Sequence, residues 1–149
     1  MRATTHLCVL LVGGLLSACA VTPRVPGTAS AASVPDGVGS VAADAVQLLQ
    51  GRYPPGATYW TLARPARDGF GVALVDTLRR QGYAVQEASA SRGKPQPAPA
   101  GPTLDYVFEP VDAGVYRLTL QIGTRSMSRA YMAAGNGRMQ PAGAWSHKE

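Results

Sequence analysis

The chain has 149 residues, a formal net charge of +5, two cysteines and two histidines. This length suits one domain and excludes two domains of ordinary size. The mild positive charge is typical of a solvated surface and also suits acidic partners, so it excludes no class of partner by itself.

The N-terminus has the pattern of a secretory signal peptide. Arg2 supplies the positive charge, and an apolar stretch begins at Leu7. From Leu7 to Val21, this stretch would span about 22 Å as a helix. Because the hydrocarbon core of a bilayer needs roughly 30 Å, the segment is too short for a comfortable transmembrane helix. We therefore predict a signal peptide over residues 1–18.

The sequence Leu16-Ser17-Ala18-Cys19 directly follows this apolar stretch and resembles the bacterial lipobox. The resemblance implies cleavage before Cys19 and lipidation of its thiol. The residue after the cysteine is Ala20 and not aspartate, which by the usual sorting pattern implies the outer membrane. The alternative is an ordinary secretion signal followed by an incidental cysteine.

After cleavage and lipidation, the chain would keep no free cysteine and one histidine. Cys8 would be removed and Cys19 acylated, so no disulfide forms within the chain. His147 would be the remaining histidine, which excludes a zinc site built from cysteine and histidine and makes a Ser-His-Asp triad depend on the tail. We expect no metal and no cofactor.

Residues 19–39 are rich in small residues, proline and glycine and lack periodicity. Such a composition buries too little apolar surface to offset the entropy of ordering, so we predict a flexible tether. A helix is predicted from Ser40, as N-cap, to Gln50, with an apolar face formed by Val41, Ala45, Leu48 and Leu49.

The middle of the chain predicts a β-α-β unit. Residues 58–62 are aromatic and β-branched and favour a strand. A second helix is predicted from the N-cap Asp68 to the stop at Gly82, and residues 83–87 predict a short strand. The apolar face of this helix comprises Phe70, Ala73, Leu74, Thr77 and Leu78.

Residues 88–103 form a Pro-rich loop in which Lys94 to Pro99 favours polyproline geometry. A ligand for a proline-binding module is possible there, but a flexible insertion is the commoner meaning of such a loop. Alternating apolar residues then predict strands over 104–109 and 116–122. A third strand is predicted over roughly 127–133, followed by the turn Gly135-Asn136-Gly137 and a short return segment.

These elements predict an α+β fold in which two helices pack on a small mixed or antiparallel sheet. The single domain is expected over residues 40–149, on the periplasmic side of the membrane.

No pattern of catalytic residues stands out. Two carboxylates could in principle cleave a glycosidic bond, but nothing in the sequence distinguishes one pair as catalytic. Asp68 is explained as a helix cap and Asp112 as a turn residue, and no glycine motif has phosphate-loop spacing. We therefore predict no enzyme activity. The acids of the mature chain are Asp36, Asp44, Asp68, Asp76, Glu87, Asp105, Glu109, Asp112 and Glu149.

Basic residues near aromatic ones are a possible nucleic-acid surface in the C-terminal part. Tyr116, however, belongs to the buried set of its strand, so it would not face the same side as Arg117. We do not expect direct nucleic-acid contact. The residues considered are Arg117, Arg125, Arg129 and Arg138, with Tyr116 and Tyr131.

Two stretches, together with the lipobox and the length, resemble the TrbH family of conjugal transfer lipoproteins. The first stretch runs from Ala57 to Val85 and includes Asp68-Gly69-Phe70-Gly71; the second joins Ser128-Arg129-Ala130-Tyr131 to Pro141-Ala142-Gly143-Ala144-Trp145. The resemblance implies a structural part in the mating-pair-formation apparatus, a type IV secretion system that transfers plasmid DNA.

The resemblance further implies contacts with other channel proteins at the outer membrane and carries over only Cys19, as the lipid site. By analogy with ring-forming modules of secretion channels, a homo-oligomeric ring is possible, with docking near Trp145 or at sheet edges. The alternatives are a cell-wall-acting enzyme and an unrelated envelope-binding lipoprotein.

Overall fold

The structure is a computed structural model that describes residues 37–88 and 101–149. The predicted signal peptide, Cys19, most of the predicted tether and most of the Pro-rich loop lie outside the described residues.

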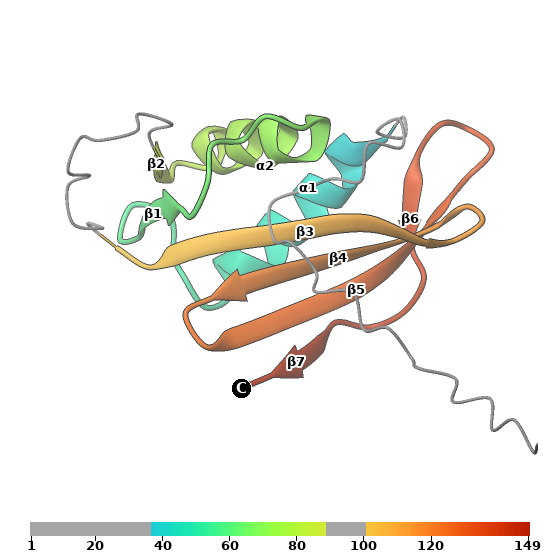
Figure 1. The fold of residues 1–149 in the computed structure, drawn as a ribbon. Helices are drawn as coiled ribbons and strands as arrows, with labels where there is room; N and C mark the ends of the chain where they lie inside the picture. The colour runs from blue at the N-terminus through green and yellow to red at the C-terminus, as the bar shows by residue number, and fades with distance from the viewer. Residues whose placement is uncertain (1–36, 89–100) are drawn as a thin grey trace, which may run out of the picture.

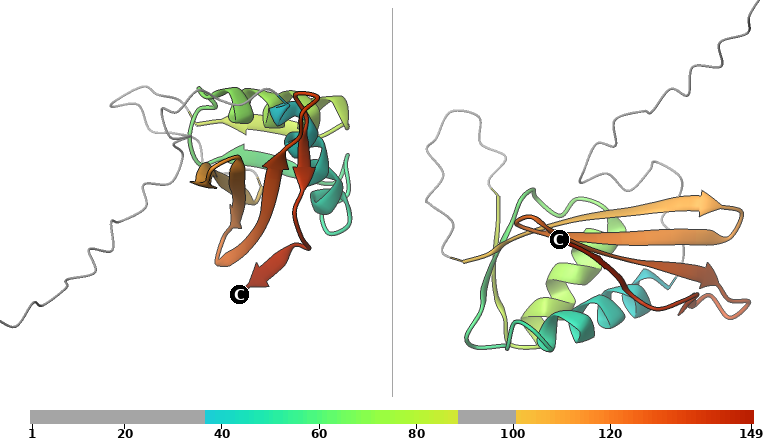
Figure 2. Two further views of the ribbon diagram at one scale, coloured as in Figure 1. Left: turned by 90° about the vertical axis from the view of Figure 1, so that its right-hand side faces the viewer. Right: turned by 90° about the horizontal axis from the view of Figure 1, so that it is seen from below.

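The domain is α+β, as predicted, with two helices on one side of a mixed sheet (Figure 1). The strand order is β2-β1-β3-β4-β5-β6, and β7 also pairs with β5. Figure 2 shows the two helices covering the same face of the sheet. The elements are α1 (Val38–Gln50), β1 (Tyr59–Leu62), α2 (Gly69–Arg80), β2 (Ala84–Glu87), β3 (Thr103–Asp112), β4 (Val115–Ile122), β5 (Arg125–Ala133), β6 (Met139–Pro141) and β7 (Ser146–Lys148).

The N-cap of helix α1 is Gly37, three residues before the predicted N-cap Ser40. Gly37 has a φ of 91° and lies so close to the β5–β6 turn that a Cβ would stand 2.4 Å from the carbonyl oxygen of Gly137. Only glycine fits both conditions. The tertiary contact therefore sets the start of this helix, and a local capping side chain does not.

Helix α2 confirms both predicted ends. The Asp68 side chain accepts a hydrogen bond from the amide of Gly71, and Gly82 follows the helix with a φ of 87°. The amides of Gly82 and Tyr83 donate to the carbonyls of Arg79 and Leu78, which is a Schellman motif. These two local signals therefore fix both ends of α2.

The predicted β-α-β unit is present, because β1 and β2 are parallel neighbours joined through α2. The β3–β4 and β4–β5 pairs are antiparallel, with the buried and exposed alternation expected from the sequence. The C-terminal tail, for which the sequence pattern predicts no element, forms β7. Thus β6 and β7 together cover the outer edge of β5.

The core lies between the helices and the sheet. Trp60, Phe70 and Tyr131 are the largest side chains that are fully buried in it. Phe70 stacks on Phe108 with ring centroids 5.1 Å apart, and Tyr53 packs edge-on against Trp60 at 4.9 Å. Within residues 37–88 and 101–149, neither helix is long and apolar enough to cross a membrane.

Candidate functional site

Arg129 is the centre of a polar cluster that joins α1 to β5 and the C-terminal segment. Its Nη1 donates to both carboxylate oxygens of Asp44, at 2.9 and 3.0 Å, and its Nε donates to the carbonyl oxygen of Gly143 at 2.7 Å. The guanidinium carbon lies 5.9 Å from the centre of the Trp145 ring, within range of a cation–π contact. One side chain thus holds three segments that are distant in sequence.

Tyr131 completes this cluster. Its hydroxyl donates to Oδ2 of Asp44 at 2.6 Å, and its ring is fully buried. Burial, and then the hydrogen bond and negative charge of Asp44, raise the pKa of the Tyr131 hydroxyl well above its ordinary value of 10.0. The hydroxyl therefore stays protonated and serves as a fixed donor.

A second cluster joins α2 to β3. The hydroxyl of Tyr106 donates to Oδ2 of Asp68, while Oδ1 of the same carboxylate caps the helix through the amide of Gly71. Burial, followed by the same kind of hydrogen bond, raises the pKa of Tyr106. A Cβ on Gly71 would stand 1.9 Å from the Tyr106 hydroxyl, so glycine is needed for this close approach.

The four basic residues considered for nucleic-acid contact do not form one surface. Arg129 faces the helices and is bound by Asp44, whereas Arg117 lies on the opposite face of the sheet and pairs with Glu109 at 2.7 Å. Arg125 begins β5, and Arg138 lies in the β5–β6 turn. The two aromatic residues already have contacts within the domain, because Tyr116 stacks on Phe108 and Tyr131 binds Asp44.

Each acid among the described residues has a partner, which leaves no evident catalytic pair there. Asp44 and Asp68 belong to the clusters above, and Asp112 accepts from the amide of Ala113. In the part of the chain that the structure describes, no group of three or more potential ligands could hold a metal ion, and His147 is exposed on β7. The remaining pairs are Asp76–Arg80, Glu87–Arg79, Asp105–Arg64, Glu109–Arg117 and Glu149–Arg125.

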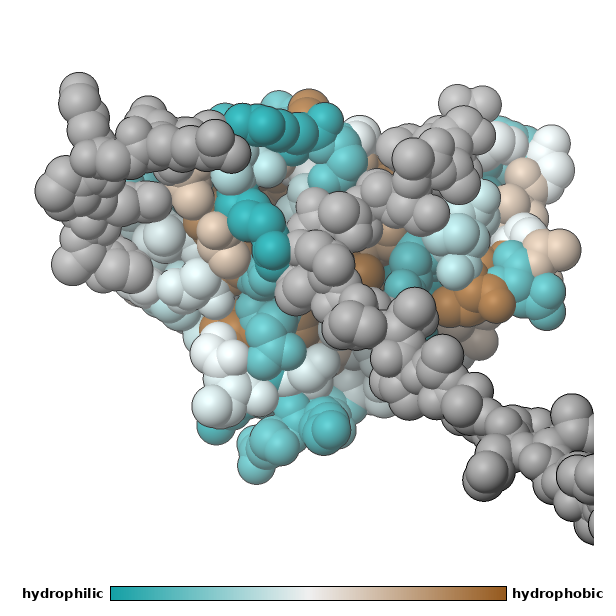
Figure 3. Space-filling model, in the orientation of Figure 1, coloured by the Kyte–Doolittle hydropathy of each residue, from teal (hydrophilic) through white to brown (hydrophobic). Residues whose placement is uncertain are grey.

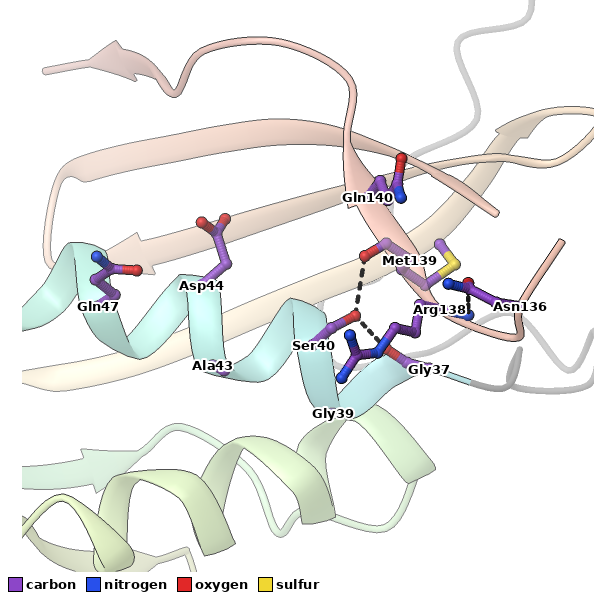
Figure 4. Close-up of a pocket in the computed structure, with 10 residues that line it drawn as sticks. All are labelled: Gly37, Gly39, Ser40, Ala43, Asp44, Gln47, Asn136, Arg138, Met139 and Gln140. Atoms are coloured by element: carbon purple, nitrogen blue, oxygen red, sulfur yellow. Dashed lines mark hydrogen bonds between the residues drawn. The ribbon is translucent and has the colours of Figure 1, made fainter. Parts of the chain in front are cut away.

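A hollow of about 680 Å³ lies between the N-terminal half of α1 and the β5–β6 turn (Figure 4). The Ser40 hydroxyl contacts the carbonyl oxygens of Gly37 and Met139, at 2.7 and 2.9 Å. Two of the residues that line the hollow are charged, Asp44 and Arg138. Asp44 is already bound by Arg129. The hollow is therefore an open polar cleft and shows no arrangement suited to catalysis.

The described surface seen in Figure 3 is mostly polar, with small and separate apolar areas. Trp145, considered as a docking residue, is partly buried against the core beneath Arg129. The sheet edges remain available for contacts, since among the described strands β2 pairs only with β1, and β7 pairs only with β5.

Residues from both stretches that resemble the family lie in the two clusters. Asp68 and Gly71 form the second cluster, and Arg129, Gly143 and Trp145 meet in the first. Asp44 was not recognised from sequence as a member, because its partner lies 85 residues away.

Comparison with known proteins confirms the family resemblance. A family model described as conjugal transfer protein TrbH matches residues 23–149. No curated protein and no solved structure matches the chain. Since the match covers most of the chain, including both clusters, the chain belongs to the TrbH family of conjugal transfer proteins.

Proposed function

We propose that this protein is an outer-membrane lipoprotein that acts as a structural and assembly component of a conjugative type IV secretion channel. The observation that carries the proposal is the family match over residues 23–149. The lipobox-like sequence ending at Cys19 supports the membrane anchor.

In this proposal, residues 1–18 direct export and are removed, and acyl chains on Cys19 hold the protein in the membrane. Each buried methylene contributes about 0.8 kcal/mol, so two or three chains give a stable anchor where one gives only a marginal one. The described part of the chain begins at Gly37, so residues 20–36 lie between it and the proposed anchor. As a flexible chain, a connection of this length would reach about 25 Å.

The domain's polar side chains support a scaffold role more than a catalytic one. Asp44, Arg129 and Tyr131 fix α1 on the sheet, and Asp68 and Tyr106 fix α2. Such a rigid module would act by docking on larger channel proteins. Several anchored copies arranged in a ring would gain avidity from their shared membrane surface.

The test is affinity pull-down of the protein from gently solubilised envelopes of conjugating donor cells. Wild-type protein is compared with Cys19→Ala, which removes the proposed lipid site. Cys8→Ala is the matched control, because it removes the other cysteine within the predicted signal peptide.

We expect wild type and Cys8→Ala to recover channel components and Cys19→Ala to recover much less. Recovery of no channel component from conjugating cells would overturn the scaffold role. Equal recovery with Cys19→Ala would overturn the lipid anchor but leave the channel contacts standing.

A further inference from the structure

A basic groove lies at the end of the domain opposite the start of α1. It is formed where the segment after α1 faces the beginning of β5 and the C-terminal strand β7. The residues that line it are Arg52, Tyr53, Arg125, Ser126, Met127, His147, Lys148 and Glu149.

Cations outnumber acids in this groove, because Arg52, Arg125 and Lys148 line it together with the single acid Glu149. Arg52 and Lys148 are exposed and have no ion pair with any described residue. Arg125 is 3.7 Å from Glu149, the longest of the ion pairs in the described residues, and both side chains are more than half exposed. Elsewhere in the described part, the arginine–carboxylate pairs are closer, so this groove is a local excess of cations.

The groove runs beside an open sheet edge. Strand β7 pairs with β5 through Ser146, His147 and Lys148, and no other described strand pairs with its outer side. Open edges can accept a further strand from another chain through main-chain hydrogen bonds. A lysine on such an edge opposes pairing with apolar or basic strands, including a second copy of the same edge.

We propose that this groove binds an extended, carboxylate-bearing segment of a partner protein. The segment adds to the outer edge of β7 and presents acids on both of its faces. The register of β5 and β7 places the Lys148 side chain on the face of Ser126, whereas Arg125 lies on the opposite face with Met127. The inference extends the proposed function by giving the chemistry of a partner. It does not depend on the lipid anchor.

The geometry favours an acidic polypeptide over a nucleic acid. The cations gather at one end of the domain, whereas a bound strand of nucleic acid needs a basic track with stacking platforms along it. Tyr53, which lines the groove, already packs edge-on against Trp60. A short edge strand with cations on both of its faces instead matches an extended peptide with acids at consecutive positions, because successive side chains of a strand point to opposite faces.

The test measures binding of a fluorescein-labelled peptide of about ten residues, in which pairs of glutamates alternate with single threonines, to the full chain purified in detergent. Fluorescence anisotropy is followed at low salt and again at physiological salt. The groove variant combines Arg52→Glu with Lys148→Glu. The control variant combines Arg67→Glu with Arg138→Glu, two further exposed arginines that have no ion pair with described residues and lie away from the groove.

Both double variants change the net charge equally, so only position distinguishes them. We expect saturable binding that weakens at least about tenfold in the groove variant and less than about twofold in the control. No saturable binding, or an equal loss in both variants, would overturn the proposal. Tighter binding of an oligothymidylate of equal charge, with displacement of the peptide, would also overturn it in favour of nucleic acid.

Discussion

The two helix–sheet junctions use the same tyrosine–aspartate hydrogen bond but neutralise the carboxylate differently. At the α1 junction, Asp44 lies within the helix, and Arg129 supplies the opposite charge. At the α2 junction, Asp68 lies before the first turn, where the helix amides and dipole favour a negative charge. Neither aspartate is left in a poorly hydrated site without compensation.

The two junctions differ in how far along the chain the hydrogen-bond partners of each carboxylate lie. The Asp68 carboxylate is satisfied largely by its own helix, and only Tyr106 comes from a distant segment. The Asp44 carboxylate depends entirely on β5, and Arg129 also holds Gly143 and Trp145. We therefore expect the α1 junction to be the more sensitive to substitution.

The largest effect is expected from Arg129→Met. The substitution leaves Asp44, whose side chain is 22% exposed, without its cation and frees the segment around Gly143. We expect a loss of about 3 kcal/mol in the free energy of unfolding, measured by urea titration. Adding Asp44→Asn should restore part of it, because the uncompensated charge is then removed.

Arg125→Met is the matched control for this prediction. Its pair with Glu149 is long and exposed, so its loss should cost no more than about 0.5 kcal/mol. Similar losses for Arg125→Met and Arg129→Met would contradict the role assigned to the α1 junction.

A smaller effect is expected from Gly71→Ala at the α2 junction. Alanine in a helix is normally more stable than glycine, but here its Cβ would displace the Tyr106 hydroxyl. We expect a net loss of about 2 kcal/mol in the free energy of unfolding. Tyr106→Phe in the same background should recover only part of it, because the ring carbon also lies close, at 2.8 Å.

Gly39→Ala in α1 serves as the control, because nothing lies within 4 Å of the position that the new methyl group would take, and the φ of Gly39 is not positive. It should leave stability unchanged or raise it by up to about 1 kcal/mol. A neutral Gly71→Ala would show that Tyr106 does not need its close approach to the helix.

Both junctions should also make stability depend on alkaline pH. Burial raises the pKa of Tyr106 and Tyr131, so above pH 10 the unfolded chain loses protons that the folded chain keeps. Stability should then fall by about 1.4 kcal/mol per pH unit for each tyrosine. Below pH 10 these two hydroxyls should contribute no pH dependence.

The measurement is urea unfolding at a series of pH values on both sides of pH 10. The double variant Tyr106→Phe/Tyr131→Phe should show a shallower fall above pH 10 than wild type. Tyr59→Phe is the control, since the Tyr59 hydroxyl binds Gln86 and no aspartate. An unchanged slope in the double variant would contradict the assignment.

Local signals in the sequence were enough for the β-α-β unit and the antiparallel strands. Asp68 and Gly82 fix the ends of α2 through short-range hydrogen bonds, and period-two alternation fixes the buried faces of β3 and β4. The predicted N-cap of α1 is three residues late, because the start of this helix depends on contact between Gly37 and Gly137. Such a contact has no local signature.

The role of Arg129 was only partly accessible from sequence. The same alternation places it with Met127 and Tyr131 on the buried face, so a buried arginine in need of an acid could have been inferred. The identity of that acid could not be inferred, because Asp44 lies far away in the chain. The basic groove was missed for a similar reason, since it joins the end of α1 to the C-terminal tail.

The central claim is tested most directly by the frequency of plasmid transfer from donor cells that lack this protein. We predict that transfer falls sharply and is restored by wild type and by Cys8→Ala, but not by Cys19→Ala. Undiminished transfer without the protein would contradict the scaffold role, and full restoration by Cys19→Ala would contradict the proposed anchor.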